Sequence, residues 1–464
     1  MKELDLGIGS VGGLVRRFSV PCVISMVVAA LYNIVDQIFI GWSEAGAYGN
    51  AATNIVYPFT VFALGLALLV GDGAAAGFSI ALGKGDKKQA NRYVGNGLTI
   101  LVAIAVILCM IGFARSTQIL GLFGGNPEEA ECYVYATDYY RIICLGIPFY
   151  MIGQGMNACI RADGSPKYAM GCTLAGAVTN LIFDPILIFC FDMGVKGAAI
   201  ATIMGQILTF VMSIAYLTRA KNFKMDAEIL RPERKTAVNI ISVGMASLIV
   251  QLSIVIIIAV NNNLLTKYGY ETFASTGEAF GAVIPLAVVG IVMKVFGIVI
   301  SIVIGVSLGG QPIIGFNMGA GNMKRVKETI QLITKLVLFV GFIAFLIFEM
   351  APDAIIFLFG SHNTPDYMEY ARLCIRIFLG GIILTCYIKS AAIILQSMGN
   401  SLKSTVLALL RDVFIFVPAS IIIATILRSI VTMLWAAVIS DVIAALIGFL
   451  FIQSEIRKFE RQLK

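Results

Sequence analysis

Apolar residues gather along the chain into long runs, and short polar stretches separate these runs. A helix needs about 20 apolar residues to cross the hydrocarbon core of a bilayer, and on that measure the runs predict twelve membrane-spanning helices. They cover residues 18–42, 54–81, 93–113, 133–160, 168–191, 197–217, 240–265, 282–309, 329–350, 367–398, 404–427 and 431–452. Only helices and closed barrels satisfy their backbone polar groups inside lipid, and these runs are too long for barrel strands. The pattern therefore predicts an all-α, polytopic membrane protein.

The composition supports a lipid environment and excludes several classes of protein. Of the 464 residues, 59% are hydrophobic and 13% are charged, whereas a soluble domain carries about 25% charged residues. The loops are too short to hold a soluble catalytic domain, and the phosphate-binding pattern Gly-x-x-x-x-Gly-Lys-Ser/Thr is absent. We therefore expect no enzyme activity, no organic cofactor and no ATP hydrolysis. An ion gradient or the membrane potential would have to supply energy.

Basic residues are distributed unevenly between the two sides of the predicted membrane. With the N-terminus inside, 23 Lys and Arg residues fall in inner loops and termini, and 4 fall in outer loops. Cytoplasmic loops carry the excess of positive charge in membrane proteins. We expect a multi-pass protein of the plasma (inner) membrane with both termini cytoplasmic. The net charge of +7 follows from this bias toward an anionic lipid leaflet, so no nucleic-acid partner is expected.

The two halves of the chain repeat each other at a nearly constant spacing. Three glycines of the first half recur 236 positions later, and one arginine and two further glycines recur 235 positions later. The matched pairs are Gly73 and Gly309, Gly83 and Gly319, Gly85 and Gly321, Arg141 and Arg376, Gly146 and Gly381, and Gly164 and Gly399. Because each repeat holds six spans, both repeats have the same orientation and their symmetry axis lies along the membrane normal.

This repeat predicts two lobes. The N-lobe, residues 1–217, holds helices 1–6; a cytoplasmic linker covers 218–238; the C-lobe, residues 239–464, holds helices 7–12 and a basic tail. Duplicated six-helix bundles are typical of transporters whose cavity lies between the lobes and faces one side at a time. A duplicated scaffold without transport and a membrane receptor are the alternatives that remain open.

Four oxygen-bearing side chains lie at similar depth in the predicted N-lobe. Asp36 is on helix 1, Asn180 and Asp184 are one turn apart on helix 5, and Thr202 is on helix 6. At about 1.5 Å per residue, they lie within about one turn of one another in depth. Such oxygens suit a hard monovalent cation such as Na⁺, and two close carboxylates readily share a proton. We predict a cation or proton site here; the alternative is a buried hydrogen-bonded network that only fixes packing.

The second half does not repeat this set. The counterpart of Asp184-Pro185 reads Val417-Pro418, so the proline persists and the acid does not. A different charge, Lys294, lies near the middle of helix 8, where a cation must pair or face water. We therefore consider Lys294 a candidate for the substrate pathway.

Several motifs together resemble the multidrug and toxic compound extrusion (MATE) family, in particular its bacterial and archaeal multidrug branch. They are Pro21 with the stretch 32–41 (YNIVDQIFIG), the loop 83–86 (GKGD), the segment 160–166 (IRADGSP) and the segment 180–185 (NLIFDP). The resemblance covers essentially the whole chain. It implies a V-shaped pair of six-helix bundles that exports organic cations and amphipathic drugs in exchange for Na⁺ or H⁺. Such secondary active efflux contributes to antibiotic resistance, and we expect a monomer.

The resemblance also implies roles for particular residues. The N-lobe cation site of that branch uses an aspartate on helix 1, an asparagine and an aspartate on helix 5 and a threonine on helix 6. These match the same four residues: Asp36, Asn180, Asp184 and Thr202.

The second lobe departs from part of the family. Some relatives carry an acid on helix 7, whereas helix 7 here offers Gln251 and Asn261. An ion site in the C-lobe is therefore not implied, and these two residues join Lys294 as substrate-pathway candidates. The alternative function is a lipid-linked precursor flippase of the same superfamily. Its cavity should be lined by several basic residues, and here Lys294 and Lys389 are the main candidates.

Overall fold

The computed structural model describes residues 5–44, 46–123, 130–224, 226, 228–272, 283–358 and 365–462. The first half of the chain forms η1 (Asp5–Gly7), α1 (Val11–Trp42), α2 (Gly46–Gly83), α3 (Lys87–Ala114), α4 (Ser116–Leu122), α5 (Ala130–Ala162), α6 (Pro166–Pro185), η2 (Ile186–Cys190) and α7 (Gly194–Leu217). The second half begins with α8 (Arg234–Thr272), α10 (Val283–Gly319), α11 (Met323–Met350), α12 (Pro352–Leu358), α13 (Pro365–Leu373), η3 (Cys374–Phe378) and α14 (Ile382–Ser397). It ends with α15 (Ser401–Leu409), η4 (Leu410–Phe416), α16 (Val417–Leu427), α17 (Ile430–Met433) and α18 (Trp435–Gln462).

The predicted all-α membrane fold is confirmed. Within the described residues, eleven helices or helix runs are each long and apolar enough to cross a bilayer, and one bent pair supplies a twelfth span. That pair corrects one detail, because the sequence predicts a single helix over 367–398. The structure bends by 46° between Met368–Phe378 and Ile382–Ser397. The bend falls where a Cβ added to Gly381 would lie 2.4 Å from Asp441 Oδ2, so the chain passes too close to α18 for any larger residue.

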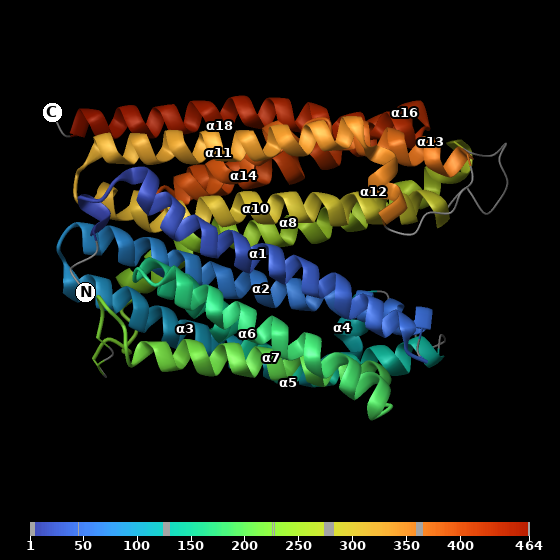
Figure 1. Ribbon diagram of the computed structural model, residues 1–464, viewed down its shortest axis with the longest axis horizontal. Helices are drawn as coiled ribbons and strands as arrows, with labels where there is room; N and C mark the ends of the chain where they lie inside the picture. Colours follow the sequence, from blue (N-terminus) through green and yellow to red (C-terminus); the bar gives the residue numbers. More distant parts are fainter. Residues whose placement is uncertain are drawn as a thin grey trace.

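The helices form two bundles with separate cores. One buried apolar cluster runs from Ile40 to Ile240, and a second runs from Leu265 to Ile452. In Figure 1, α1–α7 lie together below, and α8 and the later helices lie together above. Helix α1 begins and α18 ends on the same side, at the left of that view. We call this side the termini end of the molecule.

The two lobes meet closely at the termini end. A Cβ added to Gly83 would lie 2.0 Å from the carbonyl oxygen of Phe316, and one added to Gly319 would lie 2.1 Å from that of Ile80. Positions 80 and 316, like 83 and 319, are 236 apart. The two contacts are therefore one contact made twice about the pseudo-two-fold axis between α2 and α10.

A second pair of contacts follows the same rule. A Cβ added to Gly73 would lie 2.1 Å from the Ile240 carbonyl oxygen on α8, and one added to Gly309 would lie 2.4 Å from Ser19 Cα on α1. Ser19 and Ile240 are 221 positions apart, which gives the spacing between equivalent residues of α1 and α8. Four of the glycines that mark the repeat, Gly73, Gly83, Gly309 and Gly319, thus let the backbones of the two lobes touch.

The segment before α1 closes this end further. Leu6 is buried, and the side chains of Asn317 and Arg325 donate to its carbonyl oxygen at 3.0 and 3.1 Å. Both donors belong to the second half of the chain. The N-terminal segment therefore ties the first lobe to the second.

The motif segment 160–166 has a structural role on the N-lobe. Asp163 is fully buried and accepts hydrogen bonds from the Tyr216 hydroxyl at 2.6 Å and from the backbone N–H groups of Lys221 and Asn222 at 2.7 and 2.8 Å. Because these donors lie at the end of α7 and in the linker, Asp163 anchors the linker to its own lobe.

Candidate functional site

The structure brings together the four oxygen-bearing residues that the sequence singles out. Asp36 comes from α1, Asn180 and Asp184 from α6, and Thr202 from α7. The Asn180 amide donates to Asp184 Oδ1 at 3.1 Å and to the Thr202 hydroxyl at 3.3 Å. The carboxyl groups of Asp36 and Asp184 lie within electrostatic range of each other. Two carboxylates in each other's range repel, and a bound proton or cation would reduce that repulsion.

This cluster, which we call the acid cluster, lacks a positive partner. Asp36 Oδ1 and Asp184 Oδ2 are buried without a hydrogen-bond partner, and the ion pairs of the described chain involve neither acid. A buried carboxylate without a counter-charge is costly. The donor set of two carboxylates, one amide and one hydroxyl fits Na⁺ or a proton. Within the described residues no group of three or more His, Cys, Asp and Glu side chains could hold another metal.

A tyrosine that the sequence did not single out also belongs to this cluster. The buried Tyr139 of α5 lies within electrostatic range of Asp36, Asp184 and Tyr32. Its sequence neighbours Asp138, Tyr140 and Arg141 give no sign of the acids, and only packing reveals that α5 faces both of them. Tyr32 lies one helical turn before Asp36 on α1, a spacing that places both on one helix face.

The backbone beside Asp184 is locally widened. Pro185 ends α6 and cannot donate a backbone hydrogen bond, and the π-helix η2 follows it at once. Short π-helical segments are frequent at functional sites, and a proline leaves the backbone oxygen of the preceding turn free. In the second lobe the π-helix η4 instead precedes the equivalent proline, Pro418.

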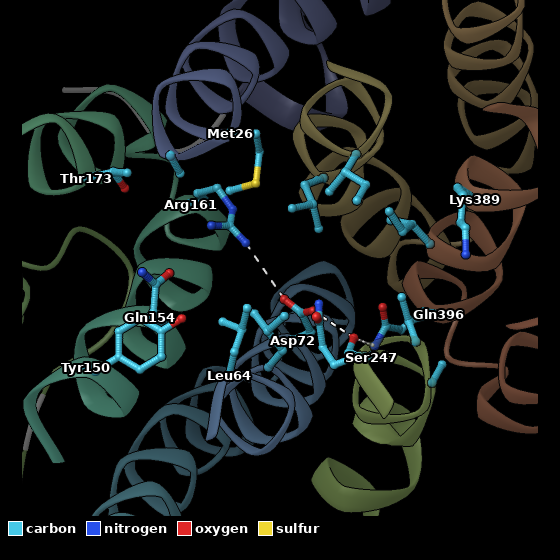
Figure 2. A pocket seen from close by; sticks show the side chains of 18 of the residues that line it. Met26, Leu64, Asp72, Tyr150, Gln154, Arg161, Thr173, Ser247, Lys389 and Gln396 are labelled. Atoms are coloured by element: carbon cyan, nitrogen blue, oxygen red, sulfur yellow. Dashed lines mark hydrogen bonds and ion pairs between the residues drawn. The ribbon is translucent and has the colours of Figure 1, made fainter. Parts of the chain in front are cut away.

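A cavity of about 290 Å³ lies between the lobes beside the acid cluster (Figure 2). Asn180 and Thr202 belong both to the cluster and to the cavity wall. Much of the wall is apolar, with residues such as Met26, Leu64, Leu68, Ala246, Val250, Ile304, Leu308 and Ile393. Its neutral polar groups include Tyr32, Tyr150, Gln154, Gln206, Ser247, Gln251 and Gln396.

The three substrate-pathway candidates fall in different places. Gln251 lines the central cavity. Lys294 is exposed on α10 and is not part of the cavity wall. Asn261 lines a second, water-sized cavity of about 10 Å³ inside the second lobe, where its side-chain oxygen has no hydrogen-bond partner. The structure therefore brings only Gln251 to the central cavity.

A polar chain crosses from one lobe to the other at the wall of the central cavity (Figure 2). The Ser247 hydroxyl of α8 donates to Asp72 Oδ2 of α2 at 2.8 Å, and the Gln396 amide of α14 donates to Ser247 at 3.0 Å. Arg161 of α5 lies 3.8 Å from Asp72 Oδ1. These hydrogen bonds could not be identified from the sequence, because Asp72 and Ser247 are 175 positions apart.

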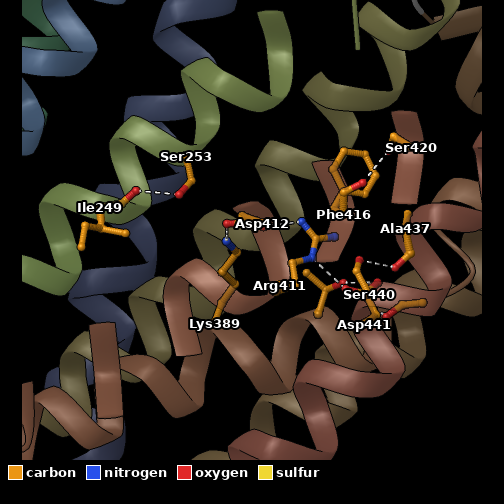
Figure 3. A network of polar contacts seen from close by, with 12 residues as sticks. Ile249, Ser253, Lys389, Arg411, Asp412, Phe416, Ser420, Ala437, Ser440 and Asp441 are labelled. Atoms are coloured by element: carbon orange, nitrogen blue, oxygen red, sulfur yellow. Dashed lines mark hydrogen bonds and ion pairs between the residues drawn. The ribbon is translucent and has the colours of Figure 1, made fainter. Parts of the chain in front are cut away.

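The second lobe carries a charged network of its own (Figure 3). Lys389 Nζ lies 2.7 Å from Asp412 Oδ2, and the Arg411 guanidinium bonds Asp412 Oδ1 at 2.7 Å and Asp441 Oδ1 at 2.8 Å. Thr385 adds a hydrogen bond to Asp441 at 2.7 Å. Two cations and two anions are thus matched, and Lys389 and Arg411 also line the central cavity.

Two pseudo-symmetric helical lobes, a cavity between them and an unbalanced acid cluster beside it define a membrane transporter of the duplicated six-helix class. The family model described as MatE matches residues 21–186 and 279–421. This is more than half of the chain, which therefore belongs to the MATE transporter family.

Curated relatives and solved structures agree with that assignment. The chain is 24% identical over 443 residues to the multidrug export protein MepA of Staphylococcus aureus, covering 94% of this chain and 92% of the relative. The MepA protein of Staphylococcus saprophyticus is also 24% identical, with the same coverage. A MATE structure in complex with MaL6 has a TM-score of 0.90 at 21% identity, covering 99% of this chain and 100% of that one. An outward-facing multidrug resistance MATE transporter has a TM-score of 0.89 at 22% identity, covering 99% of both chains.

Proposed function

We propose that this transporter exports small organic cations and amphipathic drugs from the cell by antiport with Na⁺ or H⁺. The observation that carries the proposal is the pair of the half-buried Asp36 and the buried Asp184, which have no ion-pair partner among the described residues and lie beside the inter-lobe cavity. A role in multidrug export is also supported by the names of the curated relatives.

Coupling follows from the position of the acid cluster between three helices. A Na⁺ ion or proton bound there reduces the repulsion between Asp36 and Asp184 and so holds α1 against α6. When it leaves, this cost returns and α1 favours another arrangement, with Pro21 as a place to bend. Because Asn180 and Thr202 also line the cavity, substrate and ion can favour different arrangements of the same helices. Antiport requires this linkage.

The cavity wall favours an amphipathic substrate over an anionic headgroup. Its apolar side chains suit an aromatic or aliphatic body, and its amides and hydroxyls can adapt to varied polar groups. Three basic residues do line it, Arg161, Lys389 and Arg411, but each one has an aspartate partner. An anionic lipid-linked precursor would have to break these pairs, so we favour drug export over the flippase.

We further propose that the termini end faces the cytoplasm, as the excess of basic residues there favours. Because the lobes touch at this end, the structure then has the outward-facing arrangement. One chain carries both lobes and the whole cavity wall, so a monomer in the plasma membrane suffices for transport.

The direct test is ethidium efflux from proteoliposomes under Na⁺ and pH gradients imposed one at a time. We expect efflux to follow at least one gradient in the wild type and in Asp138→Asn. That matched control alters a partly exposed acid of α5 that pairs with Lys196. Asp36→Asn and Asp184→Asn should transport at background level. Wild-type protein that ignores both gradients would overturn the proposal.

A further inference from the structure

Asp72 makes a hydrogen bond between the lobes while lining the cavity. It accepts from the Ser247 hydroxyl of the opposite lobe at 2.8 Å, and its side chain is buried. The next residue, Gly73, packs against the backbone of Ile240 on the same opposing helix, α8. The carboxylate therefore lies where the cavity ends and the closed interface between the lobes begins.

The pseudo-symmetric side of the interface has no counterpart of this hydrogen bond. By the repeat spacings of 236 and 221, the equivalents of Asp72 and Ser247 are Leu308 and Met26. These two apolar residues line the same cavity. One side of the pseudo-symmetric interface is thus closed by hydrocarbon, and the other by a buried carboxylate and a hydroxyl. A buried charge at a position that a leucine can fill is costly and indicates a role other than packing.

The charge of Asp72 is only loosely compensated. Its Oδ1 atom has no hydrogen-bond partner, and Arg161 lies 3.8 Å from that atom, beyond hydrogen-bonding distance. Arg161 in turn bonds Asn157 at 2.7 Å and leaves its Nε unpaired. In the C-lobe network, by contrast, each ion pair lies within 2.8 Å. Asp72 is the acid among the described residues that line the cavity, and its loose pairing leaves it able to accept a new cation.

We propose that Asp72 recognises the cationic group of a substrate in the cavity, and that this binding changes the contact between the two lobes. A substrate cation draws the carboxylate away from Ser247, and the loss of that hydrogen bond loosens the contact between α2 and α8. This inference rests on the proposed function, because it assumes that the cavity binds organic cations. It adds a recognition residue on the cavity wall, separate from the acid cluster.

Binding measurements on purified protein test the recognition step. We compare tetraphenylphosphonium, a permanent cation, with the neutral triphenylphosphine oxide. Asp72→Asn keeps the shape and should weaken binding of the cation by about tenfold or more, since a charged partner is lost, while binding of the neutral probe stays within about twofold. Asp72→Asn/Arg161→Gln removes both charges, so that no buried arginine is left unpaired. The glutamine is chosen because Gln396 stands at the position equivalent to Arg161. This double variant should also bind the cation more weakly and the neutral probe equally well.

Hydrogen exchange of the backbone tests the transmission step. In the wild type, tetraphenylphosphonium should speed exchange over residues 240–250 of α8. In Ser247→Met, which introduces the residue of the equivalent position 26 and removes the hydrogen bond to Asp72, exchange there should be fast without the probe. Ser253→Ala is the matched control, because the hydroxyl of Ser253 bonds only within α8, to the Ile249 carbonyl. It should behave like the wild type.

The outcomes separate this inference from the proposed function. If the wild type exports ethidium and binds both probes, but Asp72→Asn keeps its affinity for the cation, Asp72 does not recognise substrate and only this inference is wrong. Equal exchange in Ser247→Met and the wild type would likewise overturn the transmission step. Wild-type protein that neither binds the cation nor exports ethidium would overturn both proposals.

Discussion

The two lobes share one backbone plan but place their charges in opposite ways. Asp36, Asp184 and Thr202 of the acid cluster correspond by the repeat to Ile257, Val417 and Ala437. In the second lobe these positions form an apolar cluster with Phe416 and Ala436. The site that would hold a cation in the first lobe is therefore filled with hydrocarbon in the second.

At other positions the second lobe carries charged side chains where the first lobe carries neutral ones. Lys389 and Asp441 of the charged network correspond to the neutral Gln154 and Gln206, each 235 positions earlier. The backbone confirms this equivalence. A Cβ added to Gly146 would lie 2.6 Å from Gln206 Oε1, and one added to its repeat partner Gly381 would lie 2.4 Å from Asp441 Oδ2.

Charge balance distinguishes a site that binds an ion from a network that only stabilises the fold. The C-lobe network contains as many cations as anions and satisfies them at short distance, so it needs no ligand. The acid cluster contains two acids and, within the described residues, no ion-pair partner for them, so a bound proton or cation would stabilise it. Charge balance, and not burial or polarity alone, identifies the N-lobe cluster as the candidate for ion coupling.

The largest expected effect is on transport through the acid cluster. Asp184→Asn keeps the hydrogen bond from Asn180 sterically possible but removes the negative charge that binds a cation. We expect ion-driven ethidium efflux to fall to background while the protein stays folded in detergent. Efflux at the wild-type rate, with equal protein in the vesicles, would show that the negative charge of Asp184 is not needed for ion coupling.

Substitutions in the C-lobe network should lower the stability of the folded protein. Asp412→Asn leaves Lys389 and Arg411 short of a partner in a buried site, which should cost about 3–5 kcal/mol of folding free energy. The double variant Asp412→Leu/Lys389→Leu removes one full pair and should cost much less. Thermal unfolding in detergent measures both. A destabilisation of the double variant as large as that of Asp412→Asn would contradict the balanced-network interpretation.

Closure of the lobes at the termini end gives an intermediate effect. Gly83→Ala places a methyl group against the backbone of Phe316, which cannot move aside cheaply. We expect faster hydrogen exchange in α2 and α10 near this contact and slower transport. Gly297→Ala is the matched control, because no atom lies within 4 Å of the added methyl group. Equal behaviour of the two variants would argue against close packing at this end.

The smallest effect should come from Thr202. Thr202→Val keeps the shape and removes one neutral oxygen from the acid cluster, a loss of about 1 kcal/mol, or roughly fivefold in cation affinity. The cation concentration that gives half-maximal efflux should rise by that factor with little change in maximal rate. An unchanged concentration would remove Thr202 from the set of ligands.

Much of the fold and part of the site could be predicted from the sequence because both depend on position along a helix. Apolar length gives the spans, and repeated glycines give the two lobes. Depth in the membrane brings together Asp36, Asn180, Asp184 and Thr202. What could not be predicted depends on which face of a helix meets which neighbour. The proximity of Tyr139 to the acids, the bond from Ser247 to Asp72 and the exposed position of Lys294 are all of this kind.

We propose that Asp36 and Asp184 act as one coupling unit, and a double-mutant cycle on ion-driven ethidium efflux is the direct test. Two carboxyl groups that share one proton or cation are not independent. We predict that Asp36→Asn/Asp184→Asn transports no worse than either single variant, because the first substitution already removes the site. Effects of the two substitutions that simply multiply in rate would contradict the shared site, even if each residue matters alone.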